Sequence, residues 1–122
     1  QAEIGSASGM TAAAICSVRG GSKEQMGHAC AMALKNLMGL VCDPVAGLVE
    51  VPCVKRNVGG AVNALAAADM ALAGIASHIP VDQVIDAMGE VGTKMDVSLR
   101  ETSKGGVATS PKGLEIAERL GM

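Results

Sequence analysis

The sequence predicts an all-α protein, a compact helical bundle of four or five helices with one long cysteine-bearing loop. Apolar residues recur at three- and four-residue steps along most of the chain, as they do on one face of an α-helix. Capping signals, glycines and prolines divide these stretches from one another. The chain has no Phe, Trp or Tyr, so Ala, Leu, Val, Ile and the eight Met must build a closely packed core. We expect residues 1–122 to form a single domain.

The first two helices are expected over about Gly5 to Val18 and Lys23 to Val41. Ser22 and Gln25 have the spacing of a capping box, in which each side chain bonds the other residue's backbone N–H group. The first helix is rich in small residues and contains Cys16, and the second carries Cys30 on its apolar stripe. Both cysteines are therefore expected to pack as small hydrophobic residues.

The long loop is expected from Asp43 to Arg56, because two prolines and a glycine interrupt the helical pattern there. Its "GLVEVP" stretch alternates like an extended strand. Cys42 leaves the end of the second helix, and Cys53 lies within the loop itself. This is the one predicted loop that carries thiols.

A third helix is expected from an N-cap at Asn57 to about Ser77, with a face of Ala and Gly for close packing. Its length and low polarity resemble those of a membrane span. Asn63 and Asp69 lie in its middle, however, and an Asp there costs about 2.5 to 3.5 kcal/mol in a membrane. We therefore expect the central helix of a soluble bundle and no membrane partner.

The remaining elements are two further helices and a polar connection. A fourth helix follows Pro80 and ends near Gly92, and the polar loop "MDVSLRETSKGGVATS" comes next. Ser110 as N-cap and Pro111 as the first helical residue predict a short final helix.

Composition excludes several classes of function. The formal net charge is −2 and the charges are scattered, so we expect no nucleic acid partner. A small secreted disulfide scaffold would be rich in loops, whereas this sequence predicts long helices, so we expect reduced cysteines and a cytoplasmic location. The start at Gln1, with no signal-peptide pattern, suggests an internal piece of a longer chain.

Three interpretations of Cys42 and Cys53 remain open from the residues alone. A disulfide would need an oxidising compartment, and a zinc site would need two more ligands that are not near in sequence. An iron–sulfur cluster takes thiolates from sequence-distant loops. The predicted start of a helix at Asn57, with Gly59 behind it and Arg56 before it, would suit anionic sulfur or a carboxylate.

The strings "NLMGLVCDPVAGLVEVPCVKRN" and "RETSKGGVA" resemble a known family. They closely resemble the C-terminal part of the α chain, or catalytic domain, of the iron–sulfur-dependent bacterial L-serine dehydratases, also called L-serine ammonia-lyases. The resemblance covers essentially the whole sequence, from "QAEIGSASGMTAAA" onward.

The resemblance implies a [4Fe–4S] cluster held by three cysteines, with one open iron that acts as a Lewis acid on the hydroxyl of L-serine. Cys42 and Cys53 match two of the ligands, and the third is expected immediately before Gln1. The products would be pyruvate and ammonia. The implied partners are L-serine, the remainder of the alpha domain and a beta domain or chain, in an oligomer.

Candidate roles for the other residues follow from this resemblance. Glu3 adjoins the missing ligand and is the candidate for a catalytic role, while Arg56 and Asn57 are candidates for binding the substrate carboxylate. Arg100 and Thr102 are either site residues or ordinary loop packing.

Two alternatives remain at this point. The chain alone is a helical structural or interaction fragment without activity, or the parent protein is a paralogue that deaminates another small β-substituted amino acid. In either case, we expect the isolated fragment to be inactive.

Overall fold

The computed structural model describes residues 2–122 and confirms the all-α prediction. These residues contain five α-helices and three short 3₁₀-helices, and no strand among them is longer than an isolated bridge. In chain order the elements are α1 (Ala2–Val18), α2 (Lys23–Asn36), η1 (Val45–Gly47), α3 (Cys53–Leu72), α4 (Val81–Lys94), η2 (Val97–Leu99), η3 (Gly106–Thr109) and α5 (Pro111–Arg119).

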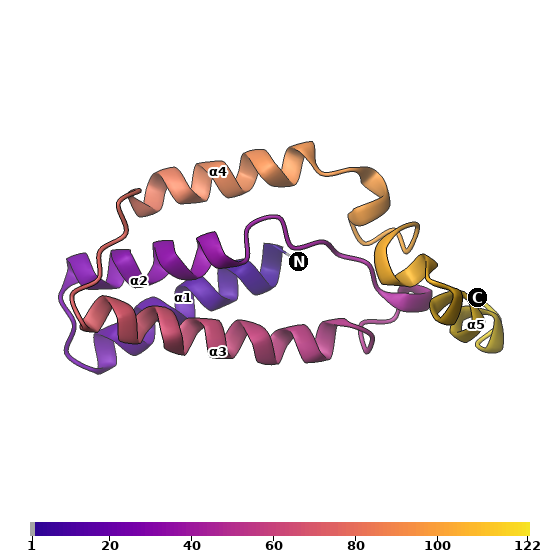
Figure 1. The fold of residues 1–122 in the computed structure, drawn as a ribbon, viewed down its shortest axis with the longest axis horizontal. Helices are drawn as coiled ribbons and strands as arrows, with labels where there is room; N and C mark the ends of the chain where they lie inside the picture. The colour runs from indigo at the N-terminus through magenta and orange to yellow at the C-terminus, as the bar shows by residue number, and fades with distance from the viewer. Residues whose placement is uncertain (1) are drawn as a thin grey trace.

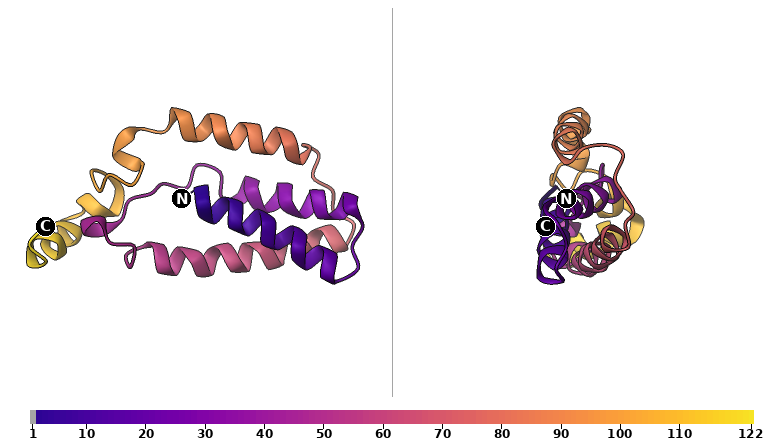
Figure 2. Two further views of the ribbon diagram at one scale, coloured as in Figure 1. Left: turned by 180° about the vertical axis from the view of Figure 1, so that it is seen from behind. Right: turned by 90° about the vertical axis from the view of Figure 1, so that its left-hand side faces the viewer.

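The helices form a bundle with a small separate end (Figure 1). Helices α1, α2 and α3 all contact one another, and α4 packs against α2. Helix α5 contacts η1 and η3 instead, beyond the end of the bundle, as the left view in Figure 2 shows. The chain crosses between the bundle and this end three times, after α2, before α3 and after α4. The first and the last of these segments carry residues of the candidate site.

The core between α1, α2 and α3 is built from small side chains, as predicted. Cys16 is fully buried among them. Gly60 of α3 lies so close to α1 that a Cβ atom at this position would be 2.8 Å from a methyl carbon of Ile4. The hydroxyl of Ser8 donates a hydrogen bond to the Gly60 carbonyl at 2.7 Å. Small residues let the helix backbones approach closely. The buried cluster consists of Ala12, Cys16, Ala29, Met32, Ala33, Ala64, Ala67, Ala68 and Ala71.

A second apolar cluster joins α2 to α4. Leu34 and Val84 are buried in it, and Cys30 packs against it in a half-buried position. This burial raises the pKa of the Cys30 thiol, since a low-dielectric surrounding disfavours the thiolate. Cys30 therefore behaves as the small hydrophobic residue that its helical position predicts.

Both predicted capping motifs are present. The backbone N–H of Ser22 donates to Gln25 Oε1 at 2.9 Å, and that of Gln25 donates to Ser22 Oγ at 3.1 Å. At the start of α5, Ser110 Oγ accepts from the backbone N–H of Gly113 at 3.1 Å, with Pro111 as the first helical residue. Local sequence thus determines where these two helices begin.

Three predicted helix boundaries are wrong. The second helix ends at Asn36 instead of Val41, because the chain turns at Gly39 with φ +82°. The third helix begins at Cys53, with Pro52 as its N-cap, so Asn57 lies inside it. It ends at Leu72 instead of Ser77.

The extended strand predicted for "GLVEVP" is also wrong. The chain instead forms η1 and a series of turns, with Ala46 and Gly47 in the left-handed region at φ 55° and 69°. The backbone N–H of Val45 donates to the Val51 carbonyl at 2.9 Å and closes the loop on itself. No helix within residues 2–122 is sufficiently long and apolar to cross a membrane.

Candidate functional site

Cys42 lies in the extended segment after α2 and pairs with the "RETS" loop. Its backbone N–H donates to the Leu99 carbonyl at 2.9 Å, and the backbone N–H of Glu101 donates to the Cys42 carbonyl at 2.7 Å. This is a parallel bridge between Cys42 and Arg100. Cys42 is only 7% exposed. The two strings that carry the family resemblance are therefore joined at Cys42.

Cys53 is the first residue of α3 and is 8% exposed. Arg56, one turn later, donates hydrogen bonds from Nη1 to the Val41 carbonyl at 3.0 Å and to Asp43 Oδ1 at 2.5 Å. These contacts bring the start of α3 against the residues on both sides of Cys42. The structure therefore brings the two loop cysteines into one region of the molecule.

Asp43 is a buried carboxylate with partners from two other segments. It is 1% exposed, and besides Arg56 it accepts a hydrogen bond at 2.7 Å from the backbone N–H of Val107 to its Oδ2 atom. Gly106 makes this approach possible, because a Cβ atom there would be 2.1 Å from Oδ2 and its φ is +62°. The glycine pair of "SKGGVA" thus has a defined role at the site.

Ser103 joins the "RETS" loop to the turn after Cys42. Its hydroxyl donates to the Pro44 carbonyl at 2.6 Å and accepts from the backbone N–H of Gly47 at 3.1 Å. The neighbouring Thr102 bonds within its own loop, to the Val97 carbonyl at 2.9 Å. Of these two residues, Ser103 is therefore the one that fixes the loop to the cysteine segment.

Backbone strain is concentrated in the same two loops. Among residues 2–122, the non-glycine residues with positive φ are Ala46 at 55°, Glu101 at 65° and Ser103 at 57°. Such conformations cost on the order of 1–3 kcal/mol each and persist where surrounding contacts determine them. Strain in the segment after Cys42 and in the loop that pairs with Cys42 favours a functional role for this region.

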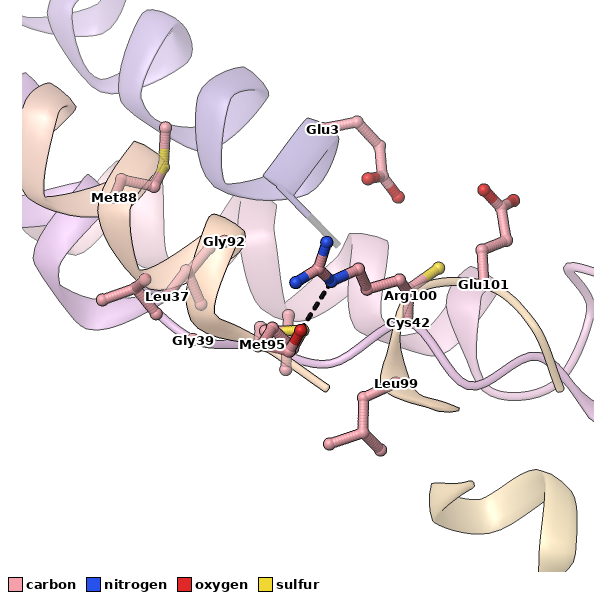
Figure 3. Close-up of a pocket in the computed structure, with 12 residues that line it drawn as sticks. Glu3, Leu37, Gly39, Cys42, Met88, Gly92, Met95, Leu99, Arg100 and Glu101 are labelled. Carbon is pink, nitrogen blue, oxygen red and sulfur yellow. Dashed lines mark hydrogen bonds between the residues drawn. The ribbon is translucent and has the colours of Figure 1, made fainter. Parts of the chain in front are cut away.

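An open pocket of about 260 Å³ lies beside Cys42 (Figure 3). Figure 3 shows the charged side chains of Glu3, Arg100 and Glu101 around this space, which the Cys42 sulfur also borders. The apolar part of the wall consists of Leu37, Gly39, Leu40, Met88, Val91, Gly92, Met95 and Leu99. A pocket that combines an apolar wall with a few charged groups is typical of a small-molecule site.

Arg100 is oriented by the end of α4. Its Nε donates to the Met95 carbonyl at 2.6 Å, and one terminal nitrogen donates to the Thr93 carbonyl. These bonds place a cation at the negative end of the α4 dipole. They engage two of the five N–H groups of the guanidinium.

The predicted site residues divide into two groups. Glu3 lines the Cys42 pocket, and Arg56 lies between the two cysteine segments. Asn57 lines a different cavity of about 460 Å³ between α1 and α3, which Glu3 also borders. The expected anion site at an Asn57 helix start is wrong, because the helix starts at Cys53. The third cysteine, expected before Gln1, lies outside the described residues.

Three residues of the site were missed by the sequence predictions: Asp43, Ser103 and Gly106. The signal that could have identified them is the string in which each occurs, since "CDP", "ETS" and "GGVA" all belong to the two stretches that carry the resemblance. Among residues 2–122, no three His, Cys, Asp or Glu side chains converge to hold a metal ion. Cys42 and Cys53 therefore stay predictions as metal ligands.

The chain resembles proteins of known name along most of its length. It matches the family model of the serine dehydratase alpha chain over residues 1–108. It is 62% identical over 120 residues to the probable L-serine dehydratase alpha chain of Bacillus subtilis (strain 168). This match covers 98% of this chain and 40% of that protein. The corresponding protein of Latilactobacillus sakei is 60% identical over 120 residues, covering 98% of this chain and 57% of that protein.

A third relative, the L-serine dehydratase alpha chain of Peptoniphilus asaccharolyticus, is 53% identical over 116 residues, covering 95% of this chain and 40% of that protein. The chain thus spans about 40 to 57% of the length of these relatives. Since the family match extends over nearly all of the sequence, this chain belongs to the serine dehydratase alpha chain family.

Proposed function

We propose that this chain is the part of an L-serine dehydratase that supplies two cluster ligands and one side of the substrate pocket. The reaction converts L-serine to pyruvate and ammonia. The observation that supports this most is the position of Cys42, a buried thiol that borders a pocket with Glu3, Arg100 and Glu101. Family membership supports the same activity.

The residues present fit a [4Fe–4S] cluster as two of its ligands. Cys42 and Cys53 are both buried, and the contacts of Arg56 bring their segments together. Iron–sulfur clusters are held by cysteine thiolates from separate segments. The resemblance predicts the third ligand immediately before Gln1. When bound, such a cluster with one iron not held by cysteine supplies a Lewis acid for the serine hydroxyl.

The charged residues of the pocket suit an amino acid in its zwitterionic form. The guanidinium of Arg100 can bind a carboxylate, and the carboxylates of Glu3 and Glu101 suit an ammonium group. We propose Glu3 as the residue that accepts the α-proton. Arg56 and Asn57 stay predictions as carboxylate-binding residues, and the contacts of Arg56 are considered further below.

The remainder of the alpha domain is proposed to cover α3. Four apolar side chains are exposed along this helix at steps of four, four and three residues: Val54, Val58, Val62 and Leu65. An apolar stripe of this kind indicates a surface that another part of the protein buries. The chain spans less than two thirds of the length of its alpha-chain relatives, which supports further alpha domain as the partner of this surface. A beta domain or chain, an oligomer and a cytoplasmic location stay predictions that the resemblance implies.

The isolated chain is proposed to be inactive, since residues 2–122 supply two of the three expected ligands. Anaerobic reconstitution with iron and sulfide would test this by the iron bound per chain. We expect no stoichiometric cluster, and a stable cluster on this chain alone would contradict the proposal.

The activity itself is tested in the full-length dehydratase that carries this sequence, purified without oxygen. Cys42→Ala and Cys53→Ala should each lose bound iron and pyruvate formation. Cys30→Ala is the matched control, because Cys30 is a half-buried thiol in α2 that packs between α2 and α4. Either loop variant with the iron content and turnover of the unchanged enzyme would overturn the ligand assignment.

A further inference from the structure

The carboxylate of Asp43 is almost completely removed from water. Its side chain is 2% exposed, and that of its partner Arg56 is 22% exposed. A buried carboxylate needs charge and hydrogen-bond partners, and the loss of one partner leaves an uncompensated charge. Arg56 Nη1 lies 2.5 Å from one carboxylate oxygen, and the backbone N–H of Val107 lies 2.7 Å from the other. Asp43 is therefore fixed from two directions.

The same contacts determine how the two cysteine segments lie. Arg56 bonds the Val41 carbonyl as well as Asp43, so its guanidinium contacts the residues on both sides of Cys42. Arg56 is also three residues from Cys53, within the first turn of α3. A change in this ion pair would therefore shift the two thiols relative to each other.

The third segment at this junction is the glycine pair near the chain's end. Gly106 leaves room for Asp43 Oδ2, because the side chain of an alanine at this position would occupy the space of that oxygen. The following residue, Val107, then donates its backbone N–H to the carboxylate. One buried carboxylate thus joins the Cys42 segment, the start of α3 and η3.

We propose that Asp43 and Arg56 are positioning residues that set the spacing of Cys42 and Cys53 for the cluster. Arg56 acts through Asp43 and the Val41 carbonyl, and this role differs from the carboxylate binding that the sequence predicts for it. The inference rests on the proposed function, because it concerns the ligands of the cluster. It adds two residues that hold the ligand segments without contacting the substrate.

Another ion pair of the chain serves as a matched control. Arg19 and Asp69 join α1 to α3, but their side chains are 48% and 64% exposed. An exposed ion pair contributes little to stability, because water screens it. Asp69→Asn therefore removes the same chemical group as Asp43→Asn, at a position distant in sequence from both loop cysteines.

The test uses Asp43→Asn, Arg56→Lys, Arg56→Gln and Asp69→Asn in the full-length dehydratase under anaerobic conditions. Iron bound per protein, the electron paramagnetic resonance spectrum of the reduced cluster, and KM and kcat for L-serine are measured. Groups that orient metal ligands typically change affinity by about 10- to 100-fold when mutated. We expect this loss in cluster retention for Asp43→Asn and Arg56→Gln, and no loss for Asp69→Asn.

Arg56→Lys separates positioning from failure to fold. Lysine keeps the charge but lacks the planar fork, so this variant should keep the circular dichroism of the unchanged apoprotein and show intermediate cluster retention with an altered spectrum. The fraction that retains a cluster should have an unchanged KM for L-serine.

Two results would overturn the inference. One is cluster retention and spectrum equal to those of the unchanged enzyme in all Asp43 and Arg56 variants. The other is a normal cluster in Arg56→Gln with KM raised 10-fold or more, which would make Arg56 a substrate-binding residue. The Cys42→Ala and Cys53→Ala variants test the cluster ligands themselves. If these two variants lose the cluster while the Asp43 and Arg56 variants keep it, the positioning inference fails and the proposed function stands.

Discussion

The backbone of Cys42 is paired with that of Arg100, a residue 58 positions further along the chain (100 − 42). The hydrogen bonds that make this bridge are 2.7 and 2.9 Å long. They attach the "RETS" loop directly to a proposed cluster ligand and bring the Arg100 side chain to the wall of the pocket. Changes in this loop are therefore expected to act on the site.

Arg100→Gln should weaken binding of L-serine in the full-length dehydratase. The variant removes the cation proposed to bind the substrate carboxylate, and truncation of a charge-assisted hydrogen bond costs roughly 1.5–3 kcal/mol, or about 10- to 150-fold in KM. Iron content should not change. Lys104→Gln is the control, since it removes an exposed cation from the same loop. An unchanged KM in Arg100→Gln would contradict the proposed role.

Gly106→Ala should destabilise the chain strongly. The added methyl group would overlap the Asp43 carboxylate, and alanine disfavours the φ of +62° at this position. We expect a loss of at least about 1–3 kcal/mol in the free energy of unfolding, measured with urea.

Gly27→Ala provides the comparison for this variant. Gly27 lies inside α2, and a Cβ atom there would have open space around it. Alanine is the better helix former, so this substitution should stabilise the chain by about 0.5–1 kcal/mol. Equal effects of the two substitutions would refute the steric role of Gly106.

Ser103→Ala should release the "RETS" loop from the turn after Cys42. It removes the hydrogen bonds to the Pro44 carbonyl and from the Gly47 N–H group, and we expect a loss of about 1–3 kcal/mol on urea unfolding. Ser98→Ala is a suitable control, because the Ser98 hydroxyl donates to Asp96 Oδ1 at 2.5 Å within one exposed turn and does not join two segments. Its effect should stay within about 0.5 kcal/mol.

The thiol of Cys30 should make stability depend on pH in the alkaline range. Burial raises its pKa in the folded chain, so the folded state retains the proton while the unfolded state loses it. This contribution is fully present below the unfolded pKa of about 8.5 and is lost as the pH rises through the folded pKa. Urea unfolding from pH 7 upward should show a smaller decline for Cys30→Ala. Identical pH profiles would contradict this assignment.

The elements that depend on local sequence could be predicted. The capping motifs at Ser22 and Ser110 involve residues three positions apart, and both are present. The small-residue core of α1, α2 and α3 follows from composition and helical spacing, and Cys16 lies within it as expected. These features need no knowledge of contacts between distant segments.

The details of the site depend on such contacts, which sequence spacing does not reveal. The predicted second helix runs past Asn36, because its apolar pattern continues to Val41 through the turn at Gly39. The predicted third helix begins too late, because Asn57 has a capping side chain and the actual N-cap, Pro52, does not. The partners of Asp43 come from α3 and from a residue 64 positions away. A single acidic residue in a loop therefore gave no sign of its burial.

The most direct test of the account is Mössbauer spectroscopy of the full-length dehydratase, purified without oxygen and enriched in ⁵⁷Fe, with and without L-serine. The proposed function predicts a [4Fe–4S] signal in which one iron site changes when L-serine is added, and no such signal in Cys42→Ala. A fully loaded cluster in Cys42→Ala, or iron sites that saturating L-serine leaves unchanged, would contradict it.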